Sequence, residues 1–330
     1  MINVLILSAG RRVELTRAFK AARDRLGIEG RVLAADCSDL APALYFADGF
    51  EIVPRISRGI EYVEAVIDIC RREEVSLIVP TIDTELLLLA QNRDLIEERS
   101  SARVLISDLR VIEICRNKIN TQRFFEEHYF LVPRLYTKEE IEEGECEYPL
   151  FIKPLDGSSS IDAYRVDDEH QLEMYMKLIE KPMVQAYMDG EEYTVDCFLD
   201  FEGNLLSLVP RIRIATRSGE IAKGRIVRDE EIKADVTRLM KELSPIGHIT
   251  VQCRRTARGI EYIEINPRFG GGAPMSIAAG ADSCEKLYRL LKGEKLSYSD
   301  EYRDNVTFLR YDASIMLDEE GRASECLWSQ

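Results

Sequence analysis

A carboxylate and an amide stand two residues apart near the end of an apolar stretch, at Glu264 and Asn266 in IEYIEINPRFGGG. In a β-strand, residues two apart share a face, so these two side chains project together. Ile263 and Ile265 are then expected to face the other way, into the core. The strand therefore offers two oxygen donors on one face.

A second predicted strand, GHITVQCRR, precedes this one and is joined to it by TARG. If Ala-Arg-Gly forms a three-residue loop with Gly259 in the left-handed conformation, Thr256 lies opposite Ile260. That register places Gln252 directly opposite Glu264, and a slip of one residue would break the pairing.

Gln252, Glu264 and Asn266 then form a patch of oxygen ligands, which hard cations such as Mg²⁺ prefer. One carboxylate and two neutral oxygens make a poor permanent cage, but they suit Mg²⁺ that arrives bound to a nucleotide, with Mn²⁺ as a possible substitute. Arg268 follows closely enough to meet the same phosphates. A solvated hairpin edge is the competing interpretation for Glu264 or Asn266 taken alone.

This pattern resembles that of the ATP-grasp ligases, most closely the carbamoyl-phosphate-synthetase-like branch. There the metal ligands are a glutamine, a glutamate and an asparagine in E-x-N-P-R, matched here by Gln252, Glu264, Asn266 and Arg268. The resemblance extends from the first strand to about Asp282 and covers a single unit without a glutaminase. It implies an ATP-dependent, ADP-forming carboxylate–amine or carboxylate–thiol ligase that forms an acyl phosphate on a small carboxylic acid.

Two lysines are candidates for binding the nucleotide phosphates. Lys153 ends a predicted strand in YPLFIKPLDGSSS, and the following loop can present backbone N–H groups to an anion. Lys118 opens a helix, where a solvated lysine is the plainer interpretation, and Asn117 replaces the aspartate that the family often has. The resemblance implies that both lysines contact phosphates and that the loop is a lid, formed by Gly157, Ser158, Ser159 and Ser160.

The segment MVQAYMDGEEYTVD resembles the family's hinge. A β-hairpin with its turn at Asp189-Gly190 is also expected from this sequence. The resemblance implies that backbone groups read adenine and that an acid holds the ribose. The acid is taken as Glu192, with Glu191 as its possible substitute, and the adenine-reading segment comprises Gln185, Ala186, Tyr187 and Met188.

The segment LVPRIRIATRSGEIAKGRIVR is a local positive cluster in an acidic chain. Arg211 and Arg213 share a strand face, and Lys223 and Arg225 are expected to meet them from a neighbouring strand. With Arg268, Arg213 and this second pair are predicted to stabilise phosphoryl transfer. A solvated basic strand is the alternative.

The acceptor substrate is assigned to loops at two ends of the chain. Arg11 and Arg12 follow the first strand, and the carboxyl ends of parallel strands are the usual binding edge. Asp83 occupies a similar place, with a helix N-cap as its expected role. The glycines after the metal motif expose their amides to a carboxylate or acyl phosphate: Gly270, Gly271 and Gly272.

Apolar runs alternate with helical patterns in the first third of the chain, including one helix over Glu85–Glu98, which predicts a parallel sheet covered by helices. Later strands joined by short turns predict antiparallel pairing. The fold class is thus α/β plus α+β: a Rossmann-like pre-ATP-grasp domain (1–110), a small lobe with linker helix and phosphate lid (111–190), and a large lobe with the metal site (191–330). The tail after about Lys286 carries no motif.

The formal charge of −15 argues against a nucleic-acid partner, and no apolar run is long enough to cross a membrane. Eight scattered cysteines without metal spacing favour a cytoplasmic protein. A catalytically silent nucleotide-binding regulator remains open. An NAD-type oxidoreductase is disfavoured, because SAGRRV has one glycine where G-x-G-x-x-G has three. A homodimer is possible.

Overall fold

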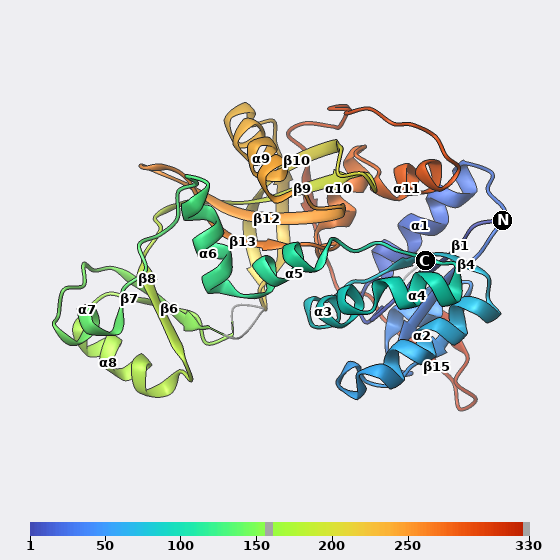
Figure 1. Ribbon diagram of the computed structural model, residues 1–330, viewed down its shortest axis with the longest axis horizontal. Coiled ribbons are helices and arrows are strands. Elements are labelled where there is room, and N and C mark those ends of the chain that lie inside the picture. The colour runs from blue at the N-terminus through green and yellow to red at the C-terminus, as the bar shows by residue number, and fades with distance from the viewer. Residues whose placement is uncertain (156–160, 326–330) are drawn as a thin grey trace.

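The computed structural model describes residues 1–155 and 161–325 of the chain. It contains an N-terminal parallel sheet, a large antiparallel sheet and a small antiparallel sheet, and Figure 1 shows the large sheet between the other two. The predicted fold class, a parallel-sheet unit followed by a unit with antiparallel sheets, is confirmed. The three predicted domain boundaries stay predictions.

The N-terminal sheet has five parallel strands in the order β3-β2-β1-β4-β5. Its strands are β1 (Asn3–Ile6), β2 (Val32–Asp36), β3 (Gly49–Ile52), β4 (Val75–Val79) and β5 (Arg103–Val104). Alternate residues of β1 enter different cores, with Val4 and Ile6 on one face and Leu5 on the other. A strand buried on both faces in this way explains the continuous apolar run.

Helices cover both faces of this sheet: α1 (Val13–Arg25), α2 (Ile60–Arg72), α3 (Asp83–Gln91) and α4 (Arg93–Ser100), with short helices η1 (Pro42–Phe46) and η2 (Ile56–Arg58). The prediction of a single helix over Glu85–Glu98 is wrong, because the helix is interrupted at Asn92, between α3 and α4. The Asn92 side chain donates to the carbonyl of Leu88 at 2.8 Å and so competes with the helical hydrogen bonds.

The large sheet has the order β13-β12-β9-β10-β11-β14. Its strands are β9 (Gly190–Leu199), β10 (Leu205–Arg217), β11 (Glu220–Ile226), β12 (Gly247–Thr256), β13 (Gly259–Asn266) and β14 (Thr307–Leu309). Its core is shared with α9 (Glu230–Leu243) and with the connecting helices α5 (Leu109–Arg116) and α6 (Lys118–Glu127).

The small sheet, of order β7-β6-β8, is packed against α8 (Glu169–Leu178), and α7 (Lys138–Glu142) precedes it. Its strands are β6 (Leu150–Pro154), β7 (Tyr164–Val166) and β8 (Pro182–Ala186). Because β8 and β9 belong to different sheets, the predicted β-hairpin at Asp189-Gly190 is wrong. That segment instead joins the small sheet to the large one.

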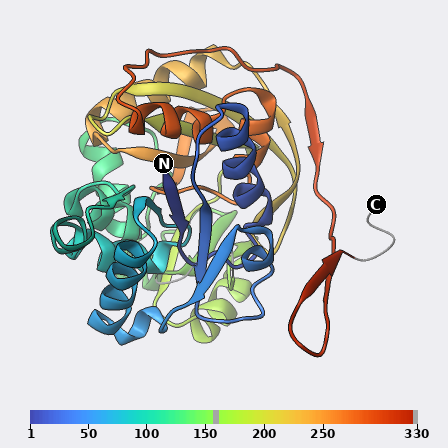
Figure 2. The ribbon, with the colours of Figure 1, turned by 90° about the vertical axis from the view of Figure 1, so that its right-hand side faces the viewer.

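The C-terminal part of the chain returns to the N-terminal unit. Helices α10 (Ala273–Ala279) and α11 (Ser283–Leu291) share a core with α1, while a hairpin of β15 (Ile315–Leu317) and β16 (Ala323–Glu325) lies apart from the body in Figure 2. Among the described residues, no helix combines the length and the apolar character that crossing a membrane requires.

Phe19 of α1 connects the N-terminal unit to the returning helices, since its ring lies 5.9 Å from Phe269 and 6.2 Å from Tyr288. We predict that Phe19→Ala lowers the free energy of unfolding by about 3–5 kcal/mol, because it removes a buried ring from a packed core. Urea unfolding monitors this change. The control is Phe50→Ala, whose ring is 43% exposed; equal losses for both variants would contradict the prediction.

Candidate functional site

The β12–β13 hairpin brings Gln252 opposite Glu264, as predicted. The turn that sets this register differs from the prediction. Thr256 pairs with Gly259 rather than with Ile260, and the pairing shifts by one residue between Gln252 and Cys253. A β-bulge at Ile263 thus compensates for the shorter turn and restores the predicted pairing at the site.

The bulge also changes where Ile263 lies. It was expected to face the core with Ile265, but only Ile265 is in the core, 1% exposed. Ile263 is partly buried and lines a cavity next to Glu264. An extra residue in one strand interrupts the alternation of faces, so two neighbouring residues line the same space.

Glu264 is the shared acceptor of the predicted metal-binding trio. Gln252 Nε2 donates to Glu264 Oε1 at 2.7 Å, and Asn266 Nδ2 donates to the same oxygen at 2.8 Å. A cation at this place would take the Glu264 carboxylate and, once both amides turn, their two oxygens. The donor set is all oxygen and therefore fits Mg²⁺. In the described part of the chain, no group of three or more His, Cys, Asp or Glu side chains could hold a metal ion.

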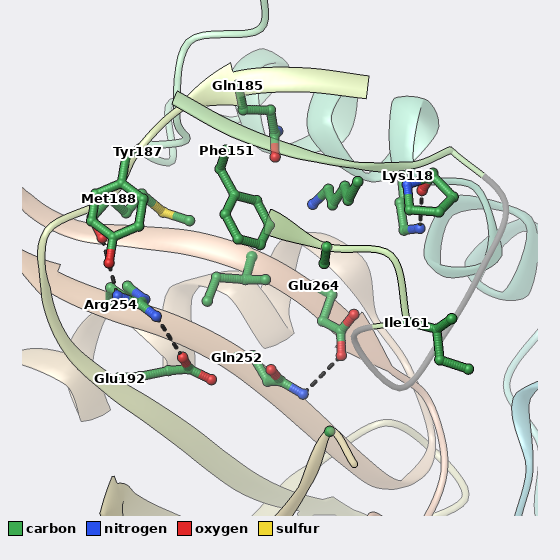
Figure 3. A pocket seen from close by; sticks show the side chains of 15 residues that line it. Lys118, Phe151, Ile161, Gln185, Tyr187, Met188, Glu192, Gln252, Arg254 and Glu264 are labelled. Carbon is green, nitrogen blue, oxygen red and sulfur yellow. Dashed lines mark hydrogen bonds and ion pairs between the residues drawn. The ribbon is translucent and has the colours of Figure 1, made fainter. Parts of the chain in front are cut away.

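Both predicted phosphate-binding lysines line a cavity together with Gln252 and Glu264, and Figure 3 shows Lys118 among its lining side chains. Asn117 caps the N-terminus of α6 by accepting from Ile119 N at 2.9 Å, and Lys118 Nζ donates to the Pro154 carbonyl at 2.6 Å. Burial, together with the nearby Lys118 ammonium, lowers the pKa of Lys153 to about 8, although Glu264 opposes the shift. The predicted lid, Gly157 to Ser160, lies outside the described residues.

The cavity that these lysines line has a volume of about 160 Å³ and lies between the small and large sheets. Phe151 and Ile263 line it with apolar surface, and Tyr187 and Met188 of the connecting segment line it too. Gln185 is anchored by a buried hydrogen bond from its Nε2 to Gln122 Oε1, at 2.8 Å. Ala186 donates its backbone N–H to Arg134 O, at 2.8 Å, and packs in the small-sheet core.

Glu192, rather than Glu191, lines this cavity. Its two oxygens are paired with different arginines: Oε1 lies 2.7 Å from Arg213 Nε, and Oε2 lies 2.9 Å from Arg254 Nη2. Glu191 instead accepts from Tyr193 at 2.6 Å. Arg254 was missed in the sequence, although it is two residues from Gln252 on one strand and so shares its face.

A second cavity of about 340 Å³ adjoins the first and shares Gln252, Ile263 and Glu264 with it. Arg12 and Arg268 line this cavity. Arg12 pairs with Glu220 at 3.3 Å, and burial, with the Arg268 charge nearby, lowers the Arg12 pKa.

Arg268 Nε donates to Asp83 Oδ1 at 3.1 Å, so Asp83 is the partner of this cation and not the helix cap that was predicted. Glu85 takes the capping role by accepting from Thr81 N at 2.7 Å and from Ile82 N at 3.2 Å.

The three predicted glycines line the second cavity. Neighbouring atoms lie so close to each of them that a side chain would not fit. A Cβ on Gly272 would lie 2.0 Å from Arg211 Nη1, and one on Gly271 would lie 2.9 Å from Arg12 Nη1. A Cβ on Gly270 would lie 2.7 Å from Thr250 Oγ1. Arg211 itself is 1% exposed and pairs with Asp196 at 3.0 Å, which holds a buried cation beneath the loop.

Three predicted cations do not reach the site. Arg11 is paired with Asp312 at the surface, with 79% of its side chain exposed. Lys223 and Arg225 are exposed on β11. Arg225 stands opposite Ile212, one residue out of phase with Arg211 and Arg213, and therefore belongs to the other face of the sheet. The catalytic roles predicted for Lys223 and Arg225, and the substrate role of Arg11, are withdrawn.

Two domain models match the sequence. One, described as "PylC-like, N-terminal domain", matches residues 4–104. The other, described as "ATP-grasp in the biosynthetic pathway with Ter operon", matches residues 179–311. No curated protein matches the sequence.

Solved structures match nearly the whole chain at low identity. The biotin carboxylase domain of Hydrogenobacter thermophilus 2-oxoglutarate carboxylase, a dimer in complex with MgADP, ADP and bicarbonate, has a TM-score of 0.71 and 17% identity over 93% of this chain and 73% of its own. N5-carboxyaminoimidazole synthetase from Staphylococcus aureus has a TM-score of 0.70 and 17% identity, covering 91% of this chain and 80% of its own. L-amino acid ligase from Bacillus licheniformis has a TM-score of 0.66 and 19% identity, covering 88% of this chain and 74% of its own.

We predict that Asp196→Asn lowers the free energy of unfolding by about 3–5 kcal/mol, because it leaves the Arg211 charge buried without a counter-ion. The matched control is Asp312→Asn, which breaks an exposed pair with Arg217 (side chains 63% and 75% exposed) and should cost about 1 kcal/mol or less. Urea unfolding of both variants makes the comparison. A loss at Asp196 no larger than that at Asp312 would show that Arg211 does not depend on its partner.

Proposed function

We propose that the chain is an ATP-dependent, ADP-forming ligase of the ATP-grasp type, a proposal that its fold and its ATP-grasp domain match over residues 179–311 support. The proposal rests on one observation. The carboxylate of Glu264, with Gln252 and Asn266, lies where a partly apolar cavity meets a cavity lined by arginines. A triphosphate in the first cavity would thus present its terminal phosphate to the second. The branch resembling carbamoyl-phosphate synthetase stays a prediction.

The first cavity has groups suited to each part of ATP. The ring of Phe151 and the Tyr187–Met188 segment offer a flat apolar slot and backbone groups for adenine. Glu192 offers its carboxylate to the ribose hydroxyls. Lys153 and Lys118 provide positive charge for the phosphates, and Lys153 is placed against Glu264 closely enough for the two charges to interact.

Mg²⁺ bound by Gln252, Glu264 and Asn266 would neutralise phosphate charge. Arg268 adds a cation beside this trio, with Nη2 at 3.4 Å from Asn266 Oδ1. Arg213 adds another cation from the same face of the large sheet, on β10. Their role is electrostatic, because phosphoryl transfer needs positioning and charge neutralisation more than a protein nucleophile.

The second cavity is suited to a carboxylic acid held by Arg12 and Arg268. A carboxylate oxygen attacks the γ-phosphorus of ATP, and the bond between that phosphorus and the bridging β-phosphate oxygen breaks. ADP departs, and the acid becomes an acyl phosphate. A nucleophile then attacks the acyl carbon, and inorganic phosphate departs with the bonding electron pair. An amine is the favoured nucleophile and a thiol the alternative. The L-amino acid ligase among the structural neighbours carries a name consistent with an amine.

The remaining proposals concern partners and setting. Small-molecule substrates are proposed rather than nucleic acid, in keeping with the acidic charge of −15. A cytoplasmic location is supported by seven free cysteines in the described part of the chain. A homodimer is proposed because the biotin carboxylase domain among the structural neighbours is described as a dimer.

We predict that phosphate release from ATP appears with a particular pair of carboxylic acid and amine, and that Glu264→Gln reduces it by about 100-fold or more, the scale of losing one charge-stabilising group. A screen of acids and amines with phosphate detection measures this. The control is Glu127→Gln, which makes the same change at an exposed position of α6. Full turnover by Glu264→Gln would contradict the metal assignment, while tight ATP binding without release for any pair would favour the silent regulator.

The pKa of Lys153, lowered to about 8, predicts a pH-dependent affinity for MgADP. Below that pKa the ammonium is charged and binds phosphate; as pH rises through it, the neutral amine loses this attraction. Affinity should fall about tenfold between pH 7 and 9, as the charged fraction falls. Calorimetric titration of Lys153→Arg, whose guanidinium stays charged, should show no such fall. A slope that persists in Lys153→Arg would assign the effect to another group.

A further inference from the structure

Glu192 is held from two sides by arginines that reach different parts of the molecule. Arg254 on β12 donates from Nη2 to Glu192 Oε2 at 2.9 Å and from Nη1 to the Met188 carbonyl at 3.1 Å (Figure 3). It therefore fixes the carboxylate to the segment that joins the two sheets. Arg213 Nε forms an ion pair with the other oxygen, Oε1, at 2.7 Å.

The guanidinium group of Arg213 is also hydrogen-bonded to the turn between β10 and β11. Its Nη2 donates to the Gly219 carbonyl at 2.9 Å, and its Nη1 donates to Thr194 Oγ1 at 3.3 Å. Ser218 and Gly219 form a two-residue turn with φ of 50° and 73°, as in a type I′ hairpin. Gly219 lines both cavities, so this turn lies at their common boundary.

The next residue of the hairpin reaches the N-terminal unit. Glu220 lies 3.3 Å from Arg12 through Oε1 and 3.1 Å from Arg310 through Oε2. Burial opposes ionisation of Glu220, but these two cations lower its pKa. A continuous series of hydrogen bonds and ion pairs thus runs from Met188 beside the first cavity, through Glu192 and Arg213, to the turn and to Arg12 in the second.

We propose that Arg213 is a positioning residue that couples nucleotide binding at Glu192 to the position of the β10–β11 turn at the acceptor cavity. The inference rests on the proposed function, because it takes the ribose to bind Glu192. A carboxylate has about four acceptor sites, so two ribose hydroxyls can add to an oxygen pair already oriented by two guanidinium groups. Nucleotide then binds best when Arg213 is ion-paired with Glu192 and hydrogen-bonded to the Gly219 carbonyl, and it favours the turn in that position.

The test is amide hydrogen exchange over residues 214–222 of the full chain, with and without saturating MgADP. Exchange in this segment should slow at least about fivefold with MgADP, the lower end of usual coupling between sites. A nucleotide without the ribose hydroxyls, 2′,3′-dideoxy-ADP with Mg²⁺ at matched saturation, should give less than half of that protection.

Arg213→Lys keeps the charge but cannot bridge Glu192 and the Gly219 carbonyl with a planar fork, so it should abolish the protection. Arg217→Ala is the control, because it alters the same turn at an exposed residue that pairs with Asp312; it should retain the effect. Circular dichroism checks that both variants fold.

Calorimetry of MgADP binding to the unmodified chain separates the two hypotheses. If MgADP does not bind, the proposed function fails. If it binds and exchange over 214–222 is unchanged, or if the protection persists in Arg213→Lys or with the dideoxynucleotide, the coupling through Arg213 is overturned while the nucleotide site stands.

Discussion

One carboxylate determines how the site is arranged. Glu264 accepts from Gln252 and Asn266 on a single oxygen, and it lies where two cavities share their lining. A buried or half-buried carboxylate is stable only if donors or cations satisfy it. The two amides supply that need in the free protein, and the same side chains carry the oxygens that a hard cation requires. The hairpin register therefore sets both the stability of this carboxylate and the chemistry available to it.

The arginines around Glu264 follow a related constraint. Four arginines that line the second cavity each have an acidic partner: Arg12 with Glu220, Arg211 with Asp196, Arg213 with Glu192 and Arg268 with Asp83. Pairing lets an acidic chain keep cations in a cleft without leaving them uncompensated. Two of these pairs, Arg12–Glu220 and Arg268–Asp83, connect the N-terminal unit to the large sheet. The second cavity is thus formed jointly by the N-terminal unit and the large-sheet unit.

Much of this arrangement could be predicted from the sequence because it depends on local periodicity. The alternation of strands and helices in the first third of the chain, the helix that begins at Lys118, and the pairing of Gln252 with Glu264 follow from the spacing of apolar and polar residues. The bulge at Ile263 could not be predicted in this way, since two errors of one residue, in the turn and in the strand, cancel at the site.

The remaining misses have physical causes of the same kind. Lys223 and Arg225 were placed at the site by proximity in sequence, but Arg225 pairs with Ile212, out of phase with Arg211 and Arg213, and both side chains are exposed. Asp83 was taken as a cap because helix starts favour acids, whereas its partner, Arg268, is 185 residues away. Arg254 carried a usable signal, its two-residue spacing from Gln252, but its contacts to Met188 and Glu192 depend on how the two sheets meet.

The most direct measurement of the central claim is a crystal structure with Mn²⁺ and a non-hydrolysable ATP analogue, with anomalous scattering used to locate the metal. The account predicts an anomalous peak about 2.0–2.3 Å from a Glu264 oxygen, with Gln252 and Asn266 turned to offer their oxygens and the triphosphate running from Phe151 towards Arg268. A metal bound away from Glu264, or a nucleotide lodged outside these two cavities, would contradict it.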